Sequence, residues 1–405
     1  MTLEAGLARA IHSEVRAPRV RYDLSHACRN GRASRSSTAC DASGSRWSEA
    51  PENKSAGDSK GGSKWRLVSK TQGKKASLSF GGEGSSFFTF RATHELSSSG
   101  SAMDEDSVRK ILDTRKESFV LCPEEVEVLM AKGGFETKED LLLELVKNTA
   151  HLSLPPISNF HVSCAALGSS GRVYIGVNIE FRELPLPSAL HAEQFLVMNA
   201  FQHQEEALEI LYISHVPCGH CRQFMCELHR SEHMTILING IEGERFTLPQ
   251  LLPLRFTPRD LIGDEARFLF QPRDNELRLP KEVEESLREG GETLEAAMAE
   301  RALKEANASY APYSNCPSGL CLSDASGNLY GGCLVESAAY NPTVSPLHSA
   351  LVNGLVNGLG GWEAITQVTL VEAKDAAVKH EHVIRECLKF ICPGAKYTVL
   401  PAEGK

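Results

Sequence analysis

The sequence predicts an α/β protein of two tandem units, each a mixed sheet flanked by helices, preceded by a disordered tail. Three observations support this class. Strand-like and helix-like segments alternate from about residue 104 onward. A set of residues recurs at a constant offset of 156. The composition, 41% hydrophobic and 23% charged, is typical of globular proteins, and 405 residues suffice for two domains.

Residues 1–102 differ from the rest of the chain. They are rich in serine, glycine and arginine and lack apolar periodicity, so they bury too little apolar surface to offset the entropy of ordering. They carry 16 of the 43 basic and 9 of the 52 acidic residues, which leaves 27 basic against 43 acidic in the remainder. We expect a disordered tail and an acidic folded body that disfavours nucleic acid as a partner.

The composition of the tail also bears on location. An Arg- and Ser-rich leader could be an organelle transit peptide, but its nine acidic residues argue against that, and we favour an extension upstream of a start at Met103. The 12 scattered cysteines, with no secretory signal, favour reduced thiols and a cytoplasmic protein. The chain contains no run of ~18 apolar residues, so we expect no membrane span.

The predicted elements follow in order along the chain. Helical spacing of apolar residues predicts helices over 104–116, 123–132 and 137–151. Apolar, β-branched segments predict strands over 160–167, 171–181 and 208–216, and helices follow over 191–204 and 219–229. These segments predict a first domain over 103–257, a proline- and charge-rich linker over 258–290, and a second domain over 291–405.

The second domain is predicted to repeat the first. The residues that recur at the offset of 156 are Pro156, Ser158, Asn159, Gly171, Tyr174 and Glu180, which become Pro312, Ser314, Asn315, Gly327, Tyr330 and Glu336. With one residue of slippage, Leu190-His191 aligns with Leu347-His348, and Ala350 then replaces Glu193. Residues 371–375 contain no Pro-Cys-x-x-Cys. We therefore expect the second unit to be catalytically degenerate and His348 to be a buried relic.

One pair of motifs in the first unit indicates metal chemistry. His191-Ala192-Glu193 is followed by Pro217-Cys218-Gly219-His220-Cys221. Imidazole and two thiolates are ligands that zinc prefers, and a catalytic zinc keeps three protein ligands and one open position. His191, Cys218 and Cys221 supply three ligands and leave Glu193 free to move protons. This H-x-E and P-C-x-x-C pattern is typical of zinc-dependent nucleobase deaminases.

The chemistry of hydrolytic deamination accounts for each residue type. Bound zinc lowers the pKa of water from ~15.7 toward ~7, and one carboxylate in a dry site can make both proton transfers. Thiolates at the start of a helix are stabilised by its dipole, and Arg222 could donate to a sulfur. The alternative is a closed structural site, whose fourth ligand would be His215, His220 or Cys226.

Further segments resemble cytidine deaminase, of the two-domain, homodimeric type of enterobacteria and plants. The resemblance covers about residues 108–400 and rests on 158–160, 178–181, 191–194, 217–224, 313–314 and 336–342. It implies one zinc per subunit, held by His191, Cys218 and Cys221, with Glu193 as proton shuttle.

The same resemblance implies how substrate and partner bind. Asn178 and Glu180 would bind the ribose hydroxyls, Phe160 would stack on the pyrimidine, and the Val216 carbonyl would accept from the exocyclic amine. In a homodimer, Ala339 and Tyr340 of the degenerate unit would contact the partner's site, although the family has Phe where this sequence has Tyr340.

The sequence therefore predicts a hydrolase that converts cytidine and deoxycytidine to uridine and deoxyuridine in pyrimidine salvage. A carboxylate at Glu180 would repel a phosphate, which favours free nucleosides. One alternative is a nucleotide or polynucleotide cytosine deaminase, which needs basic and aromatic residues around the site. The other is a non-catalytic, zinc-stabilised scaffold, which has no need of Glu193.

Overall fold

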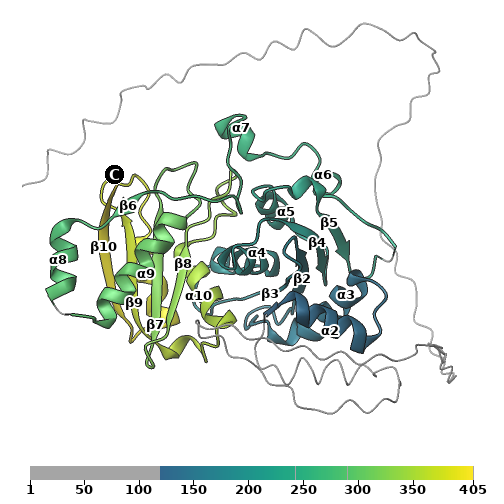
Figure 1. Ribbon diagram of the computed structural model, residues 1–405, viewed down its shortest axis with the longest axis horizontal. Helices are drawn as coiled ribbons and strands as arrows, with labels where there is room; N and C mark the ends of the chain where they lie inside the picture. Colours follow the sequence, from purple (N-terminus) through teal and green to yellow (C-terminus); the bar gives the residue numbers. More distant parts are fainter. Residues whose placement is uncertain (1–118, 242, 290, 405) are drawn as a thin grey trace, which may run out of the picture. The chain divides into compact units, whose positions relative to one another are not determined.

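The computed structural model describes residues 119–404 except 242 and 290, all within one unit, Thr71–Lys405. The predicted tail and the predicted helix over 104–116 lie outside the described residues. The described part contains two five-stranded sheets with helices packed on them (Figure 1). The prediction of two tandem α/β units is confirmed.

The first sheet has the strand order β1-β3-β2-β4-β5 and is mixed, because only β4 and β5 are parallel. Its strands are β1 Val120–Leu121, β2 Ser163–Gly168, β3 Val173–Val177, β4 Leu208–Ile213 and β5 Thr235–Ile238. The helices of this region are α2 Pro123–Gly133, α3 Lys138–Thr149, α4 Ala192–Gln202, α5 Gly219–Met225 and α6 Leu248–Leu251. The predicted elements within the described range are all present; α2 is one residue longer than predicted, and the other helices and the strands are shorter.

The second sheet has the order β6-β10-β9-β7-β8, with β9 and β10 parallel. Its strands are β6 Leu277–Arg278, β7 Ser318–Asp324, β8 Leu329–Cys333, β9 Ile365–Ala373 and β10 Lys396–Gly404. The helices that follow α6 in the chain are α7 Pro258–Ile262, α8 Lys281–Glu289, α9 Leu294–Ala308, α10 Pro346–Val356 and α11 Glu381–Ile391. The predicted linker 258–290 thus contains α7, β6 and α8, and β6 completes the second sheet by pairing with β10.

Helices α4 and α10 pack against each other, α4 on β2 and β3 and α10 on β7 and β8 (Figure 1). Every residue of α4 from Ala192 to Ala200 is buried, as expected of a helix covered on all sides. Gly176 of β3 allows the close approach, because a Cβ there would overlap the carbonyl oxygen of Ala192. One buried cluster extends through both units, so the two units share a core, and a smaller cluster lies within the second unit.

The repeat is confirmed, but the register predicted for the central helices is wrong. Ile179 pairs with Leu190 in the first unit, whereas Val335, 156 positions after Ile179, pairs with Val344 in the second. The connection before the helix is therefore two residues shorter in the second unit. The Leu-His identity at 190–191 and 347–348 is a coincidence of sequence.

The shorter connection changes which residues of the second unit correspond to His191 and Glu193. His191 is the N-cap of α4, and the N-cap of α10 is Ser345. By the same register Leu347 corresponds to Glu193, in place of the predicted Ala350. The second unit thus has neither a histidine ligand nor a carboxylate at these positions. The predicted loss of the catalytic residues holds, but the replacing residues are Ser345 and Leu347.

Among the described residues, none of the helices is both long and apolar enough to span a lipid bilayer.

Candidate active site and metal centre

His191, Cys218 and Cys221 come together in the first unit, with ligand atoms all within 4.8 Å of one another. The His191 Nδ1 lies 3.5 Å from the Cys218 Sγ and 3.3 Å from the Cys221 Sγ, and the two sulfurs are 3.6 Å apart. The structure therefore brings these three sequence-predicted side chains together.

Two helix starts produce this cluster. His191 is the N-cap of α4, and Cys218 is the N-cap of α5, so Cys221 lies in the first turn of α5. Helix N-termini present free N–H groups and a positive dipole end, which stabilise thiolates. The hydrogen bond with the Cys221 thiol, helped by His191, lowers the pKa of Cys218 to about 3. The Cys221 pKa is raised by its hydrogen bond with Cys218 and by burial, because these adjacent sulfurs share one proton.

The three donors fit a tetrahedral zinc ion. Zinc–sulfur bonds of ~2.3 Å and zinc–nitrogen bonds of ~2.0 Å place tetrahedral sulfurs ~3.8 Å apart and a sulfur and a nitrogen ~3.6 Å apart, close to the observed separations. Among the described residues the cluster has these three members and no fourth. The candidate fourth ligands have other contacts: the His215 ring packs tilted against the Phe160 ring, His220 stacks on His191, and Cys226 donates to the Arg222 carbonyl. The geometry is that of a catalytic metal site rather than a closed structural one.

Glu193 lies in the first turn of α4, two residues after the histidine. It is 5% exposed, and burial raises its pKa above the ordinary value of a glutamate. A raised pKa lets a carboxyl group take up a proton and release it again near neutral pH.

Beside the cluster is a cavity of about 420 Å³, within the range of small-molecule sites. It is lined by His191, Glu193 and Cys218 together with Phe160, Asn178, Glu180 and Val216, among others. The structure thus brings most of the sequence-predicted site residues into one cavity. Phe160 is 52% exposed and its ring contacts that of His215, with centroids 4.6 Å apart. Phe160 is therefore not an ordinary core residue.

Asn178 and Glu180 hold the segment that carries Phe160. The Asn178 Nδ2 donates to the Phe160 carbonyl, and its Oδ1 accepts from the Val162 N–H. Glu180 accepts from the Ile157 and Ser158 N–H groups and from the Ser158 hydroxyl. Burial alone would raise the pKa of Glu180, but these hydrogen bonds outweigh it and lower the pKa. Both residues therefore have a structural role as well as a place on the cavity wall.

Comparison with the degenerate unit distinguishes the structural role of Glu180 from its place on the cavity wall. Glu336 accepts from the Tyr313 and Ser314 N–H groups and from the Ser314 hydroxyl, the same arrangement as that of Glu180. Leu334, however, takes the place of Asn178 at the offset of 156. The glutamate is retained where no catalytic cluster exists, so its clamp on the preceding loop serves the fold of both units.

Three predicted residues, Arg222, Ala339 and Tyr340, do not line the cavity. Arg222 donates from Nε to the Pro217 carbonyl and from Nη1 to the Leu251 carbonyl, and among the described residues no bond from it to sulfur is present. It thus fixes the backbone that precedes Cys218, in correction of the predicted contact. Ala339 and Tyr340 are exposed on a loop of the second unit, Tyr340 with 65% of its surface accessible and a positive φ of 61°.

Two further residues, Gln194 and Glu227, contact the site or the loop beside it but were not predicted from the sequence. Gln194 follows Glu193 directly, and its Oε1 accepts from the His191 N–H in a capping box. The pattern of an N-cap followed three residues later by glutamine is visible in sequence, although a histidine N-cap hides it. No sequence signal marks Glu227, a fully buried carboxylate that accepts hydrogen bonds from the second unit.

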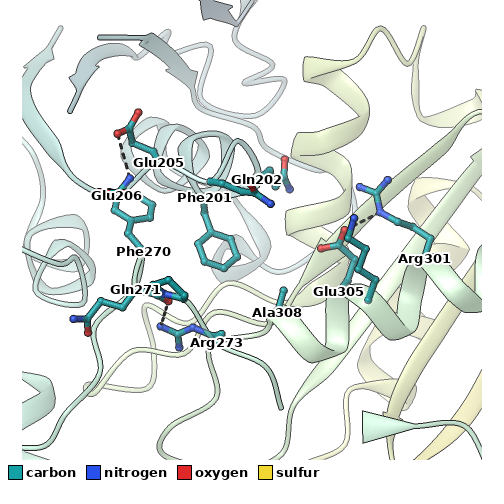
Figure 2. Close-up of a pocket in the computed structure, with 13 residues that line it drawn as sticks. Phe201, Gln202, Glu205, Glu206, Phe270, Gln271, Arg273, Arg301, Glu305 and Ala308 are labelled. Carbon is teal, nitrogen blue, oxygen red and sulfur yellow. Dashed lines mark hydrogen bonds and ion pairs between the residues drawn. The ribbon is translucent and has the colours of Figure 1, made fainter. Parts of the chain in front are cut away.

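A second cavity of about 570 Å³ lies at the other end of α4. Figure 2 shows its wall, with Phe201 and Gln202 from α4, Phe270 and Arg273 from the connecting segment, and Arg301 and Glu305 from α9. The Arg301 Nε donates to the Glu305 carboxylate. Although larger, this cavity contains none of the three zinc-competent residues, so chemistry rather than volume identifies the active site.

Comparison with known proteins agrees with this assignment. Family models described as the cytidine and deoxycytidylate deaminase zinc-binding region match residues 136–237 and again 248–385. Cytidine deaminase 1 of Arabidopsis thaliana is 40% identical over 296 residues, which cover 70% of this chain and 97% of that protein. A cytidine deaminase of Serratia proteamaculans is 33% identical over 286 residues, 70% of this chain and 90% of that protein. The chain, with its zinc-competent cluster in the first of two tandem units, therefore belongs to the cytidine deaminase family of plants and bacteria.

Proposed function

We propose that this protein is a zinc-dependent hydrolase that deaminates free cytidine and deoxycytidine, as in pyrimidine salvage. The observation that carries the proposal is the convergence of three zinc-competent donors and a buried carboxylate, Glu193, on one cavity with an exposed aromatic ring, Phe160. A zinc-stabilised scaffold needs neither the buried carboxylate nor the open ring.

In this proposal His191, Cys218 and Cys221 hold the metal. When bound, zinc supplies a Lewis acid that makes water nucleophilic at neutral pH. The Glu193 carboxylate takes the proton of the attacking water and delivers it to the pyrimidine ring nitrogen. It then takes the second proton of that water from the new hydroxyl on the pyrimidine carbon and transfers it to the amine, as the C–N bond breaks and the carbonyl forms; its raised pKa suits it to both transfers. Because Glu193 is buried, bulk water does not exchange protons with it during these transfers.

The cavity wall orients the nucleoside. The Phe160 ring offers a face for the pyrimidine, and the Val216 carbonyl, in a segment that lines the cavity, accepts from the exocyclic amine. Asn178 binds a ribose hydroxyl with the second N–H of its amide, the first being bonded to the Phe160 carbonyl. Glu180 binds with the carboxylate lone pairs that its bonds to residues 157 and 158 leave free. The ionised Glu180, its pKa lowered, disfavours a phosphate at the same place. This charge supports nucleosides over nucleotides and polynucleotides.

We also propose that the active form is a homodimer with one zinc per subunit. The support is the exposed Tyr340 ring, held on a loop whose base is fixed by the Ala338 N–H bond to Glu227. In the dimer, Ala339 and Tyr340 contact the partner's site. Sedimentation should give twice the chain mass, and Tyr340→Ala should raise KM more than it lowers kcat. A fully active monomer would contradict this assembly. We propose a cytoplasmic location, to be checked with a C-terminal fluorescent fusion.

One experiment tests the function. The zinc-loaded protein is incubated with cytidine, deoxycytidine, CMP and a cytosine-containing oligonucleotide, and the loss of the cytosine absorbance is followed. We expect turnover of both nucleosides and at least ~100-fold lower kcat/KM for CMP, because a Coulomb repulsion of ~3 kcal/mol corresponds to that factor. Turnover of CMP or of the oligonucleotide at the cytidine rate would replace the proposal by the nucleotide or polynucleotide alternative.

A further inference from the structure

The residue after the proposed proton shuttle joins the two units of the chain. Gln194 is 3% exposed and uses both ends of its amide. Its Oε1 accepts from the His191 N–H at 3.2 Å, and its Nε2 donates to the Pro342 carbonyl at 3.0 Å. One side chain therefore connects the backbone of a zinc-competent residue to a loop of the degenerate unit.

A second contact from the degenerate unit reaches the segment before His191. The His348 Nε2 lies 2.7 Å from the carbonyl oxygen of Ser188, and its Nδ1 lies 2.7 Å from the Ser345 hydroxyl. Because a carbonyl only accepts, Nε2 carries the proton and Nδ1 accepts from Ser345. Burial lowers the pKa of His348 and keeps it in this neutral form. His348 thus has a structural role, because it bonds the degenerate unit to the segment before His191. The prediction that it is a relic is wrong.

The loop on which Gln194 acts is itself held in place. Glu227, fully buried in the first unit, accepts from the Ala338 N–H at 2.7 Å and from the Tyr313 hydroxyl at 2.6 Å. Within the loop, the Tyr340 N–H donates to the Ser337 carbonyl. Residues 337–343 therefore form an anchored turn, and a hydrogen bond to an anchored acceptor restrains its donor.

We propose that Gln194 is a positioning residue through which the degenerate unit sets the orientation of His191 as a metal ligand. The proposal rests on the proposed function for the identity of the metal centre. The His191 backbone directs its imidazole, and Gln194, the N3 residue of α4, restrains that backbone by accepting from the His191 N–H at the N-cap. Partners of metal ligands that act in this way typically contribute 10–100-fold to metal affinity. The degenerate unit thus serves the zinc site of its own chain, in addition to the proposed contact with the partner.

The chain offers a matched control. Gln202 lies on the same helix, about 12 Å further along it, and also bonds to the degenerate unit. Its Nε2 donates to the Ser349 carbonyl at 2.8 Å, and its Oε1 accepts from Asn353 at 3.0 Å. Gln202 lies at the wall of the second cavity (Figure 2) and touches no zinc-competent residue. Loss of either glutamine weakens the same interface, but only loss of Gln194 releases His191.

The test compares Gln194→Met with Gln202→Met in the full-length protein. The zinc dissociation constant is measured by competition with a chromogenic chelator, and amide hydrogen exchange is followed in residues 337–343. We expect Gln194→Met to weaken zinc binding about tenfold and to speed exchange in this loop. Gln202→Met should keep zinc affinity within about twofold of the wild type. At saturating zinc, Gln194→Met should lower kcat with little change in KM.

Three results would decide against the proposal. Equal losses of zinc affinity in both variants would show general weakening of the interface. Unchanged zinc affinity in Gln194→Met would show that the restraint does not reach the metal. Weaker zinc binding without faster exchange in 337–343 would reduce Gln194 to a helix cap. A wild-type protein that binds zinc but deaminates no nucleoside would overturn the proposed function, yet the zinc comparison would stand.

Discussion

Replacement of Glu193 by glutamine tests the proton shuttle with little disturbance of the structure. The two side chains have nearly the same shape, but an amide neither accepts nor delivers a proton at neutral pH. Glu193 is 5% exposed and its pKa is raised by burial, so the charge is held there at a cost that glutamine does not incur. We expect Glu193→Gln to unfold at the same or a higher temperature than the wild type.

The expected loss of activity follows from the double use of this carboxylate. A single positioned acid or base typically contributes 10²–10⁴ to the rate. Because Glu193 serves both transfers, we expect the upper end, a fall in kcat of about 10⁴, which corresponds to about 5 kcal/mol of barrier. The measurement is cytidine turnover by absorbance, with zinc content by atomic absorption. Glu206→Gln, at an exposed glutamate after α4, is the control and should keep full activity.

The zinc content decides how a loss is interpreted. A variant with one zinc per chain and about 10⁴-fold lower kcat supports the shuttle. If Glu193→Gln kept zinc and more than about 1% of wild-type turnover, Glu193 would not be the shuttle, and the mechanism proposed above would be refuted.

Three further predictions follow from the structure and a fourth from the sequence. Cys218→Ala should abolish stoichiometric zinc binding while Cys226→Ala retains it; equal zinc contents would exclude Cys218 as a ligand. Phe160→Ala should raise KM about tenfold, from ~1–3 kcal/mol of base stacking, with a melting temperature near the wild type's; a large drop in that temperature would show a packing role instead. Burial lowers the pKa of His380 from 6.5 to about 4. The free energy of unfolding should therefore be unaffected by this residue above pH ~6.5 and should fall by about 3 kcal/mol as the pH is lowered from there through 4. His380→Leu should flatten this part of the curve of stability against pH, and parallel curves for variant and wild type would contradict the assignment. Deletion of residues 1–102 should leave turnover unchanged, and a large loss would assign the segment a role in folding or at the site.

The local features of the site could be predicted from the sequence, because they depend on residue type and short spacing. His191-Ala192-Glu193 and Cys218-Gly219-His220-Cys221 each lie at a helix start, and a helix start brings their side chains to one end whatever the rest of the fold does. The mixed sheets and the repeat were likewise predictable from alternating segments and from identities at one offset. The failure of the repeat alignment at His348 shows the limit of this reasoning. Two residues missing from a connection shift the register of the next helix, and only the strand bridge Val335–Val344 reveals it.

The amino-acid sequence by itself determined which side chains could bind zinc and which carboxylate could move protons, because ligand chemistry belongs to the residue type. Only the tertiary structure decided that His215, His220 and Cys226 do not join the cluster and that Arg222 binds carbonyl groups. It also decided that Gln194, 148 positions from its acceptor, ties the metal site to the degenerate unit. Such contacts depend on how two units pack, and hydrogen bonds between residues distant in the chain leave no periodicity in the sequence.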